Sequence, residues 1–363
     1  MPNFVKKSGY HTGIFGKWHL GDEPERWPSS AALTRCSFTV PEALGKSSLV
    51  PVLTPNNSYF DPWILHNGTF EKTSGYCTDV FFGQAIKWIE QQKESKEPFL
   101  AWISTNAPHD PLNCPPEWVA PYEGKVPPNI AKFFGMIANI DHNLGILRGK
   151  LHDWGIENNT LLVFMNDNGT ATGDPIFNAG MAGKKVTPDN GGTRAISFWH
   201  WPSAIKPGDC DKLTAHIDMF PTMLELAGVS IPENLQGKLD GFSLVPLLAD
   251  PNSPWHDDRI LFTHVGRWKE GKPPVKLGAC SVRQRELLAV HRPKGWELYD
   301  LKKDPGEKNN LAAEKPEALA SMIKAFDDWW EEVLPALENE DAIHTAPAIS
   351  PYHELFAKQQ AGK

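Results

Sequence analysis

The sequence predicts an α/β fold in which a large, mostly parallel sheet lies between helices, followed by a smaller C-terminal domain of antiparallel strands and one helix. The run Leu161–Met165 is apolar throughout and stops at Asn166-Asp167-Asn168-Gly169, which is typical of a strand buried on both faces of a parallel sheet. Strand and helix patterns alternate over the first 250 or so residues, and shorter strand patterns follow residue 254.

The composition is that of a globular protein and limits the classes of partner. The chain has 363 residues, 40% hydrophobic and 22% charged, which is enough for one large domain and a small one. Its net charge of -8 argues against a nucleic-acid surface, so an anionic substrate would need a local cationic pocket. No apolar run reaches the roughly 20 residues that cross a bilayer, and residues 1–7 contain no core of a secretory signal. We therefore expect a small-molecule substrate and no membrane or nucleic-acid partner.

Residues 9–21 combine four glycines with a short strand and the triplet Lys17-Trp18-His19. In an extended chain Lys17 and His19 point to the same face, where an ammonium and an imidazole suit a bound oxyanion. The alternative is a surface lysine beside a core histidine. Residues 22–57 show no clear periodicity, and a structureless loop of that length within a domain is uncommon.

The next elements are a helix, a strand and a second helix. Thr78 can cap a helix whose apolar residues follow at helical spacing. Residues 98–104 predict a buried strand that ends before His109, a histidine held between two prolines that stiffen the loop. Taken alone, His109 fits a turn residue. Residues 130–151 predict a long helix with an apolar stripe.

The second half of the chain completes the large domain and begins the small one. A glycine-rich loop from residue 179 to Arg194 carries Lys185 and leads into a strand at 195–201, and a helix near 216–228 ends on Gly228. Strands at 259–264, 285–291 and 296–300 and a helix at 316–334 predict a small antiparallel domain. The expected divisions are 1–253, 254–337 and a weakly ordered tail, 338–363.

Asp167 and Asn168 stand at the carboxyl end of the predicted central strand, where open α/β sheets bind ligands. A carboxylate oxygen and an amide oxygen suit a hard divalent cation. The alternative is an Asn-Gly turn in which both side chains only hydrogen-bond the backbone.

Taken in order, these motifs resemble the type I sulfatases, the arylsulfatase-like branch of the alkaline-phosphatase superfamily. The resemblance implies an alkaline-phosphatase-like fold and hydrolysis of sulfate esters, with sulfated carbohydrates as one substrate class. It also implies one calcium ion, a formylglycine nucleophile made from Cys or Ser, and a periplasmic or secreted full-length protein. The motifs lie at residues 9–21, 108–111, 166–169, 183–194, 217–228, 239–244 and 297–301.

The resemblance also implies roles for individual residues. Lys17 would hold the sulfate and the oxygen of the nucleophile, and His19 would orient the hydrated aldehyde and help to collapse the sulfated intermediate. His109 would face the sulfate and the leaving oxygen, and Lys185 would be the second sulfate lysine. Cations around a transferring anionic group act where charge develops.

For the metal, the resemblance implies that Asp167 and Asn168 are two of the oxygen ligands. The family's Asp-Asp metal pair does not occur in this sequence, nor does its nucleophile motif Cys/Ser-x-Pro-x-Arg; Cys114 is followed by Pro-Pro-Glu. The chain therefore resembles a sulfatase that lacks the N-terminal part of its site, and we expect residues 1–363 alone to be inactive. Val186 and the pair Asp189-Asn190 replace the family's small residue and aromatic-Glu pair.

Three alternatives stay open at this point. A phosphodiesterase or phosphonate hydrolase of the same superfamily would share the metal and the fold. A non-catalytic remnant would at most bind anions. The loss of family-like sequence over residues 23–57, with recovery at Tyr59, would follow from a local shift of reading frame.

Overall fold

The computed structural model describes residues 2–18, 57–266, 268, 272–337 and 351–362, which fall into two compact units. The first unit comprises residues 1–160, 217–243 and 347–363, and the second comprises 161–216 and 244–346. The predicted boundary near residue 253 stays a prediction, and His19 and the window 23–57 lie outside the described residues. Among the helices described, none has the length and apolar character needed to cross a bilayer.

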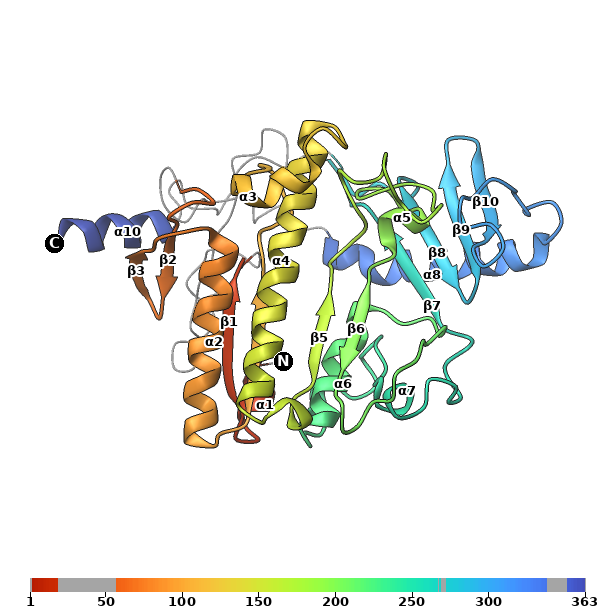
Figure 1. Cartoon of the computed structure of the whole chain (residues 1–363). Helices are drawn as coiled ribbons and strands as arrows, with labels where there is room; N and C mark the ends of the chain where they lie inside the picture. The colour runs from red at the N-terminus through yellow and green to blue at the C-terminus, as the bar shows by residue number, and fades with distance from the viewer. Residues whose placement is uncertain (1, 19–56, 267, 269–271, 338–350, 363) are drawn as a thin grey trace. The chain divides into compact units, whose positions relative to one another are not determined.

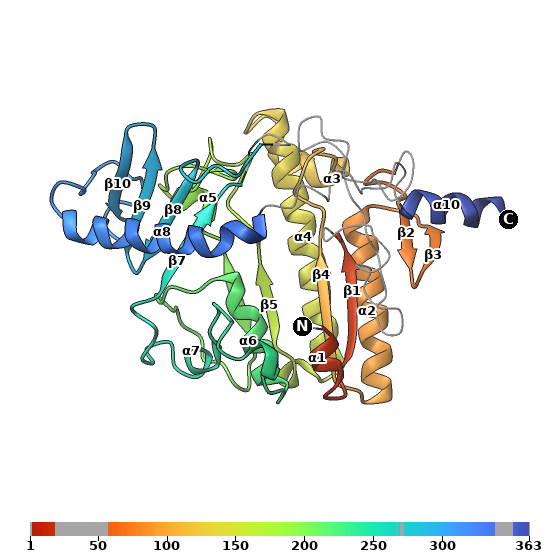
Figure 2. The same ribbon diagram turned by 180° about the vertical axis from the view of Figure 1, so that it is seen from behind.

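The first unit is built around a parallel pair of strands. β1 (His11–Gly16) pairs with β4 (Phe99–Ser104) along its whole length. A parallel pair needs a crossover connection, and α2 (Cys77–Ser95) supplies it. Figures 1 and 2 show α2 and α4 (Pro128–Asp153) on the same side of the pair. The predicted strand at 98–104 and helix at 130–151 are confirmed, although β4 is half-buried rather than buried.

The start of α2 differs from the prediction that Thr78 caps it. The helix begins at Cys77 after Tyr76, which makes no side-chain cap, and Thr78 lies buried within the first turn. The Tyr76 hydroxyl donates to the carbonyl oxygen of Asn113 over 2.9 Å, and its ring stacks on Tyr59 at 5.9 Å. Aromatic packing, rather than a capping hydroxyl, therefore fixes this helix terminus.

The C-terminal residues form a helix where a weakly ordered tail was expected. α10 (Pro351–Ala361) packs on the hairpin of β2 (Trp63–His66) and β3 (Thr69–Lys72). Tyr352 is buried there, and the Gln359 side chain bonds the backbone of the hairpin. Residues 338–350 lie outside the described part of the chain.

Short elements complete the first unit. α1 (Pro2–Lys6) packs on α6 (Met219–Leu226), with the rings of Phe4 and Phe220 edge to face at 5.9 Å. Gly228 adopts φ +67° after α6, as expected of a C-cap glycine. α3 spans Pro116–Val119, and 3-10 turns lie at Ala120–Tyr122, Glu157–Asn159 and Glu233–Leu235, with a further one at His216–Asp218.

In the second unit the predicted central strand has an antiparallel neighbour. β5 (Leu162–Met165) pairs antiparallel with β6 (Ser197–His200), and all four of its residues are half-buried. Among the residues that the structure describes, β5 pairs with no parallel strand, so the expectation of a parallel neighbour and full burial is wrong for this strand. The reason is that the intervening loop contains only the one-turn helix α5 (Asn190–Thr193), which is too short for a parallel crossover.

The predicted C-terminal antiparallel sheet with one packed helix is confirmed. Its strands follow the order β10-β9-β8-β7. α8 (Pro316–Leu337) lies across one face of the sheet (Figure 2), where Phe326 and Trp330 pack on Val282 and Leu298. The strands are β7 (Ile260–His264), β8 (Cys280–Gln284), β9 (Leu287–Arg292) and β10 (Gly295–Asp300), and the second unit also contains α7 (Val245–Ala249).

The strand β8 was not predicted. It is joined to β9 by a two-residue turn in which Arg285 adopts φ +49°. Arg285 and Glu286 are not residues that mark a hairpin turn, so the sequence predicted one strand at 285–291 instead of two.

Candidate active site

Asn166 closes the turn at the end of β5. Its amide Nδ2 donates to the carbonyl oxygen of Asn168 over 2.6 Å, and its Oδ1 accepts the backbone N–H of Ile196 over 2.6 Å. The Nε2 of His216 lies 2.8 Å from the carbonyl oxygen of Asn166. The side chain and backbone of one residue therefore fix the loop that carries Asp167 and Asn168.

Asp167 and Asn168 keep their own side-chain oxygens available. Among the described residues, neither the Asp167 carboxylate nor the Asn168 side-chain amide makes a hydrogen bond or ion pair, and Asp167 is exposed. The side-chain hydrogen bonds to the backbone that a plain turn would make are made by Asn166, a residue that the sequence analysis did not single out. The signal for it was an amide one residue before the carboxylate, a position that suits a turn-closing side chain.

Gly169 brings this loop against the glycine-rich loop of residues 182–194. Its N–H donates to the carbonyl oxygen of Gly192 over 3.0 Å, and a Cβ at Gly169 would lie 1.8 Å from the carbonyl oxygen of Gly191. No side chain fits there, so glycine is required at residue 169 by a close approach of two backbones.

Lys185 is attached to the same loop. Its backbone N–H donates to the carbonyl oxygen of Thr170 over 2.8 Å. Its ammonium makes no ion pair with another described residue, whereas the neighbouring Lys184 pairs with Asp174 at 3.6 Å. The structure therefore brings together three of the predicted site residues: Asp167, Asn168 and Lys185.

Val186 occupies a backbone conformation that β-branched residues avoid. Its φ is +74°, in the left-handed region. The resemblance placed a small residue here, and the structure gives the reason for that preference. The valine retains the conformation at a cost of roughly 1–2 kcal/mol, so other contacts must hold the loop.

In the first unit, Lys17 follows β1 at the carboxyl end of the parallel pair. Its N–H donates to the carbonyl oxygen of Ser104 over 2.7 Å, and the Ser104 hydroxyl donates back to the carbonyl oxygen of Lys17 over 2.8 Å. A Cβ at Gly16 would lie 1.9 Å from the same carbonyl oxygen of Ser104. The motif glycine before Lys17 thus allows the two strand ends to meet.

His109 lies five residues beyond Ser104 and is oriented by its neighbours. The buried Tyr59 donates its hydroxyl to the carbonyl oxygen of His109 over 2.8 Å. The ring Nδ1 lies 2.9 Å from the carbonyl oxygen of Asp110, so Nδ1 carries the proton and donates. The other nitrogen, Nε2, is then a donor only when the ring is protonated.

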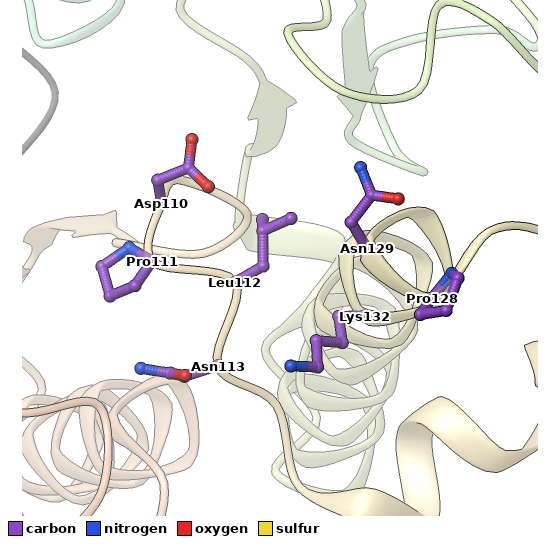
Figure 3. Close-up of a pocket in the computed structure, with 7 residues that line it drawn as sticks. All are labelled: Asp110, Pro111, Leu112, Asn113, Pro128, Asn129 and Lys132. Atoms are coloured by element: carbon purple, nitrogen blue, oxygen red, sulfur yellow. The ribbon is translucent and has the colours of Figure 1, made fainter.

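An open pocket of about 600 Å³ is lined by Asp110, the residue that follows His109 in the chain, and by six others (Figure 3). The loop after His109 forms one side of it and the first turns of α4 form the other. Its polar side chains make no hydrogen bond to another described residue. The lining residues are Asp110, Pro111, Leu112, Asn113, Pro128, Asn129 and Lys132.

Asp167 and Asn168 are the predicted metal ligands among the described residues. The described residues include no group of three or more His, Cys, Asp or Glu side chains that could hold a metal ion. Asp167 and Asn168 offer two oxygens of hard-ligand type, and Ca²⁺ takes six to eight. The pair fits such an ion as a portion of its coordination shell.

The four cysteines within the described residues are free thiols. Cys114 comes nearest to the family motif because a proline stands two residues after it. Burial, with Glu117 and Asp79 nearby, raises the pKa of Cys114 to about 12, so the thiol stays protonated at neutral pH.

These features define a hydrolase of the alkaline-phosphatase-like α/β class, and the chain belongs to the sulfatase family. The family model "Sulfatase" matches residues 1–229, and "N-sulphoglucosamine sulphohydrolase, C-terminal" matches residues 192–329. The predicted sulfuric ester hydrolase is therefore confirmed. Members of this family generally use a metal ion.

Curated relatives extend over most of the chain. It is 28% identical to an uncharacterized sulfatase, YdeN, of Escherichia coli, over 96% of this chain and 70% of that protein. It is 24% identical to human N-acetylgalactosamine-6-sulfatase, over 93% of this chain and 69% of that protein.

Solved structures confirm the predicted fold class. Ps i-CgsB, in complex with k-i-k-neocarrahexaose, has a TM-score of 0.76 at 24% identity and covers 90% of this chain and 72% of its own. BT4656, in complex with its substrate D-glucosamine-2-N,6-O-disulfate, has a TM-score of 0.68 at 18% identity, covering 91% and 81%. At these identities the likeness shows the fold alone.

Proposed function

We propose that this sulfatase acts on a sulfate ester of a carbohydrate and uses a calcium ion. The observation that carries the proposal is the pair of loops joined by the hydrogen bond between Lys185 and Thr170. They carry the side-chain oxygens of Asp167 and Asn168 and the ammonium of Lys185, which have no partner among the residues that the structure describes. Support for the substrate class comes from relatives: a sulfatase named for N-acetylgalactosamine 6-sulfate, and one solved with a sulfated glucosamine as its substrate.

Asp167 and Asn168 would each hold the calcium ion through one oxygen. When bound, the ion would polarise a sulfate oxygen. The Lys185 ammonium would bind a further sulfate oxygen, where it offsets the negative charge without giving up a proton. Since Asn166 makes the turn hydrogen bonds, the backbone that carries Asp167 and Asn168 is held in place before the substrate binds.

Lys17, His19 and His109 would handle the sulfate and the leaving alcohol. Lys17 would bind the sulfate and the nucleophile's oxygen, and His19 would orient that nucleophile. His109, in its doubly protonated form, would donate the Nε2 proton to the ester oxygen as the sulfur–oxygen bond breaks, so that the sugar leaves as an alcohol and the ring becomes neutral. The Nδ1 hydrogen bond to Asp110 fixes the ring orientation for that transfer. In this family a formylglycine supplies the nucleophilic oxygen.

The pocket lined by Asp110 would hold the sugar. Asp110, Asn113 and Asn129 offer acceptors and donors for hydroxyl groups, and Lys132 offers a cation for a second sulfate or a carboxylate. A carbohydrate with more than one anionic group fits this lining better than a plain aryl sulfate.

The test is calorimetric binding to the polypeptide of residues 1–363, which needs no nucleophile. N-acetylgalactosamine 6-sulfate, the unsulfated sugar and an aryl phosphonate monoester are titrated with and without Ca²⁺. We expect calcium-dependent binding of the sulfated sugar alone, weakened about tenfold in Lys185→Ala. Equal binding of the unsulfated sugar would refute the proposal.

The phosphonate arm tests the second candidate function. The chain has a TM-score of 0.55 at 19% identity with a phosphonate monoester hydrolase of Agrobacterium radiobacter, covering 92% of this chain and 78% of that one. Tighter binding of the phosphonate than of the sulfated sugar would favour that activity.

A further inference from the structure

Three ionisable side chains form a cluster of ion pairs that includes Asp189, a residue of the loop that carries Lys185. The Arg292 guanidinium Nη2 lies 2.5 Å from Asp189 Oδ1 and 3.0 Å from Glu307 Oε2. The two carboxyl side chains are 8% and 1% exposed. Asp189 immediately precedes α5, Arg292 ends β9, and Glu307 lies in the turn region after β10. The contact between Asp189 and Arg292 joins segments over 100 residues apart.

Further hydrogen bonds tie the same loop to the C-terminal sheet. The other oxygen of Glu307, Oε1, accepts the backbone N–H of Asn190 over 2.8 Å. The Ser281 hydroxyl of β8 donates to the carbonyl oxygen of Pro188 over 2.7 Å. Residues 188–190 are therefore fixed by side chains and not only by their own turn.

The start of the loop, at Gly183, packs against the same cluster of side chains. A Cβ at Gly183 would lie 2.5 Å from Asp189 Oδ2, so the backbone two residues before Lys185 packs directly on the carboxylate that Arg292 holds. The N–H of Ala182 donates to the carbonyl oxygen of Pro305 over 3.0 Å. Lys185 thus lies between two anchored positions, 182–183 and 188–190.

The strained Val186 shows why such anchoring is needed. A β-branched residue at φ +74° persists only where its surroundings determine the conformation. Without the anchors, the loop would relax toward ordinary backbone angles, and the direction of the Lys185 side chain would change with it. The strain therefore links the cluster to the lysine.

We propose that Arg292, with Asp189 and Glu307, is a positioning clamp that holds the loop of residues 183–190 and thereby directs Lys185 toward the sulfate. The proposal rests on the role of Lys185 in the proposed function. Arg292 itself does not contact the substrate; it acts through the lysine.

The charges of the clamp are balanced in one protonation state. Burial, together with the neighbouring Asp189, raises the pKa of Glu307 to about 7. Against the effect of burial, the hydrogen bond to Arg292 lowers the pKa of Asp189. Below about pH 7, where Glu307 is neutral, Asp189 is the one carboxylate within the clamp that faces the guanidinium. Glu297, 3.4 Å from Arg292 Nε, and Tyr299, which bonds Glu297 over 2.6 Å, complete the groups around the guanidinium.

A double-mutant cycle on the polypeptide of residues 1–363 tests the clamp. The affinity for N-acetylgalactosamine 6-sulfate is measured in Lys185→Ala, Arg292→Gln and the double variant. We expect each single change to weaken binding about tenfold, and the double variant to bind no more weakly than Lys185→Ala alone. If Arg292 only supported general folding, the loss of affinity in Arg292→Gln would add to the loss in Lys185→Ala. Additive losses in the double variant would therefore overturn the proposal.

Two variants control for folding. Arg292→Lys keeps one cation and should recover part of the affinity, and Glu307→Gln keeps the shape of the neutral acid and should bind within about twofold of the parent at pH 6. Arg285→Gln removes an exposed guanidinium from the β8–β9 turn of the same sheet and should leave the affinity unchanged. If Arg292→Gln does not fold, Glu307→Ala replaces it in the cycle with the same expected outcome.

The outcomes separate the two proposals. An unchanged affinity in Lys185→Ala would mean that the lysine does not bind sulfate, which overturns the proposed role of Lys185. A weakened Lys185→Ala with an unchanged Arg292→Gln would overturn the clamp alone.

Discussion

The backbone N–H of Lys185 donates to the carbonyl oxygen of Thr170 over 2.8 Å, which joins the glycine-rich loop to the loop of Asp167 and Asn168. Gly169 and Gly191 make that junction possible because their backbones approach more closely than any side chain would allow. The three side chains proposed to bind the sulfate and the metal are thus carried by two loops whose backbones are hydrogen-bonded to each other. The next predictions test what the side chains of these two loops do.

Asp167→Ala should lower the affinity for Ca²⁺ at least tenfold, because it removes the single charged ligand among the described candidates. Terbium luminescence or calorimetry would measure the change. Asp174→Ala is the matched control, since this carboxylate on the same loop already pairs with Lys184. Equal losses in the two variants would mean that the loop attracts cations only through its net charge.

Asn166 and Asn168 should show opposite effects. Asn166→Ala breaks two side-chain hydrogen bonds of the turn and should lower the free energy of unfolding by about 1–3 kcal/mol. Asn168→Ala, whose side chain has no described partner, should leave stability within about 0.5 kcal/mol and weaken Ca²⁺ instead. Urea unfolding and calcium titration on both variants would check the pattern. A stable Asn166→Ala protein would contradict this account of the turn.

Val186→Gly should stabilise the chain slightly. The change relieves roughly 1–2 kcal/mol of left-handed strain and costs roughly 0.5–1 kcal/mol of backbone entropy, so the net gain should be below about 1 kcal/mol. Val186→Ala removes the branch but keeps the Cβ and should gain less. Urea midpoints of the three proteins give the order, and a glycine variant less stable than the alanine one would show that the strain is absent.

The sequence predicted the parts of this site that are local. Asp167, Asn168 and Lys185 lie together because each belongs to a short motif with its own backbone geometry. The direction of the strands was harder to predict. The antiparallel β5–β6 pair depends on the lack of a crossover helix within residues 166–196, and the sequence of that loop had no clear helix or strand periodicity. The shared site of Lys17, His19 and His109 with the other three residues stays a prediction.

The clamp could not be predicted from the sequence at all. Asp189 is more than 100 residues from Arg292 and Glu307, and each of the three is by itself an ordinary surface residue type. Only the fold of the C-terminal sheet brings them together. Asp189 was noted as a departure from the family pattern, and the structure supplies its partner, Arg292.

Glu307 should make the stability of the protein depend on pH between about 4.5 and 7. Its pKa is about 7 in the folded chain and 4.5 for the unperturbed carboxyl, so the folded state binds more protons in this window. The contribution of the neutral acid to the free energy of unfolding is therefore fully present below pH 4.5. It is lost as the pH rises to 7, and the loss is at most about 3 kcal/mol. Glu307→Gln cannot ionise and should flatten that part of the profile.

Urea unfolding at pH 5, 6, 7 and 8 measures the free energy of unfolding across this range. The control is Glu286→Gln, a change at an exposed carboxyl in the β8–β9 turn. Parallel pH profiles for Glu307→Gln and the parent would show that Glu307 is already ionised at pH 5 and that the clamp holds two carboxylates.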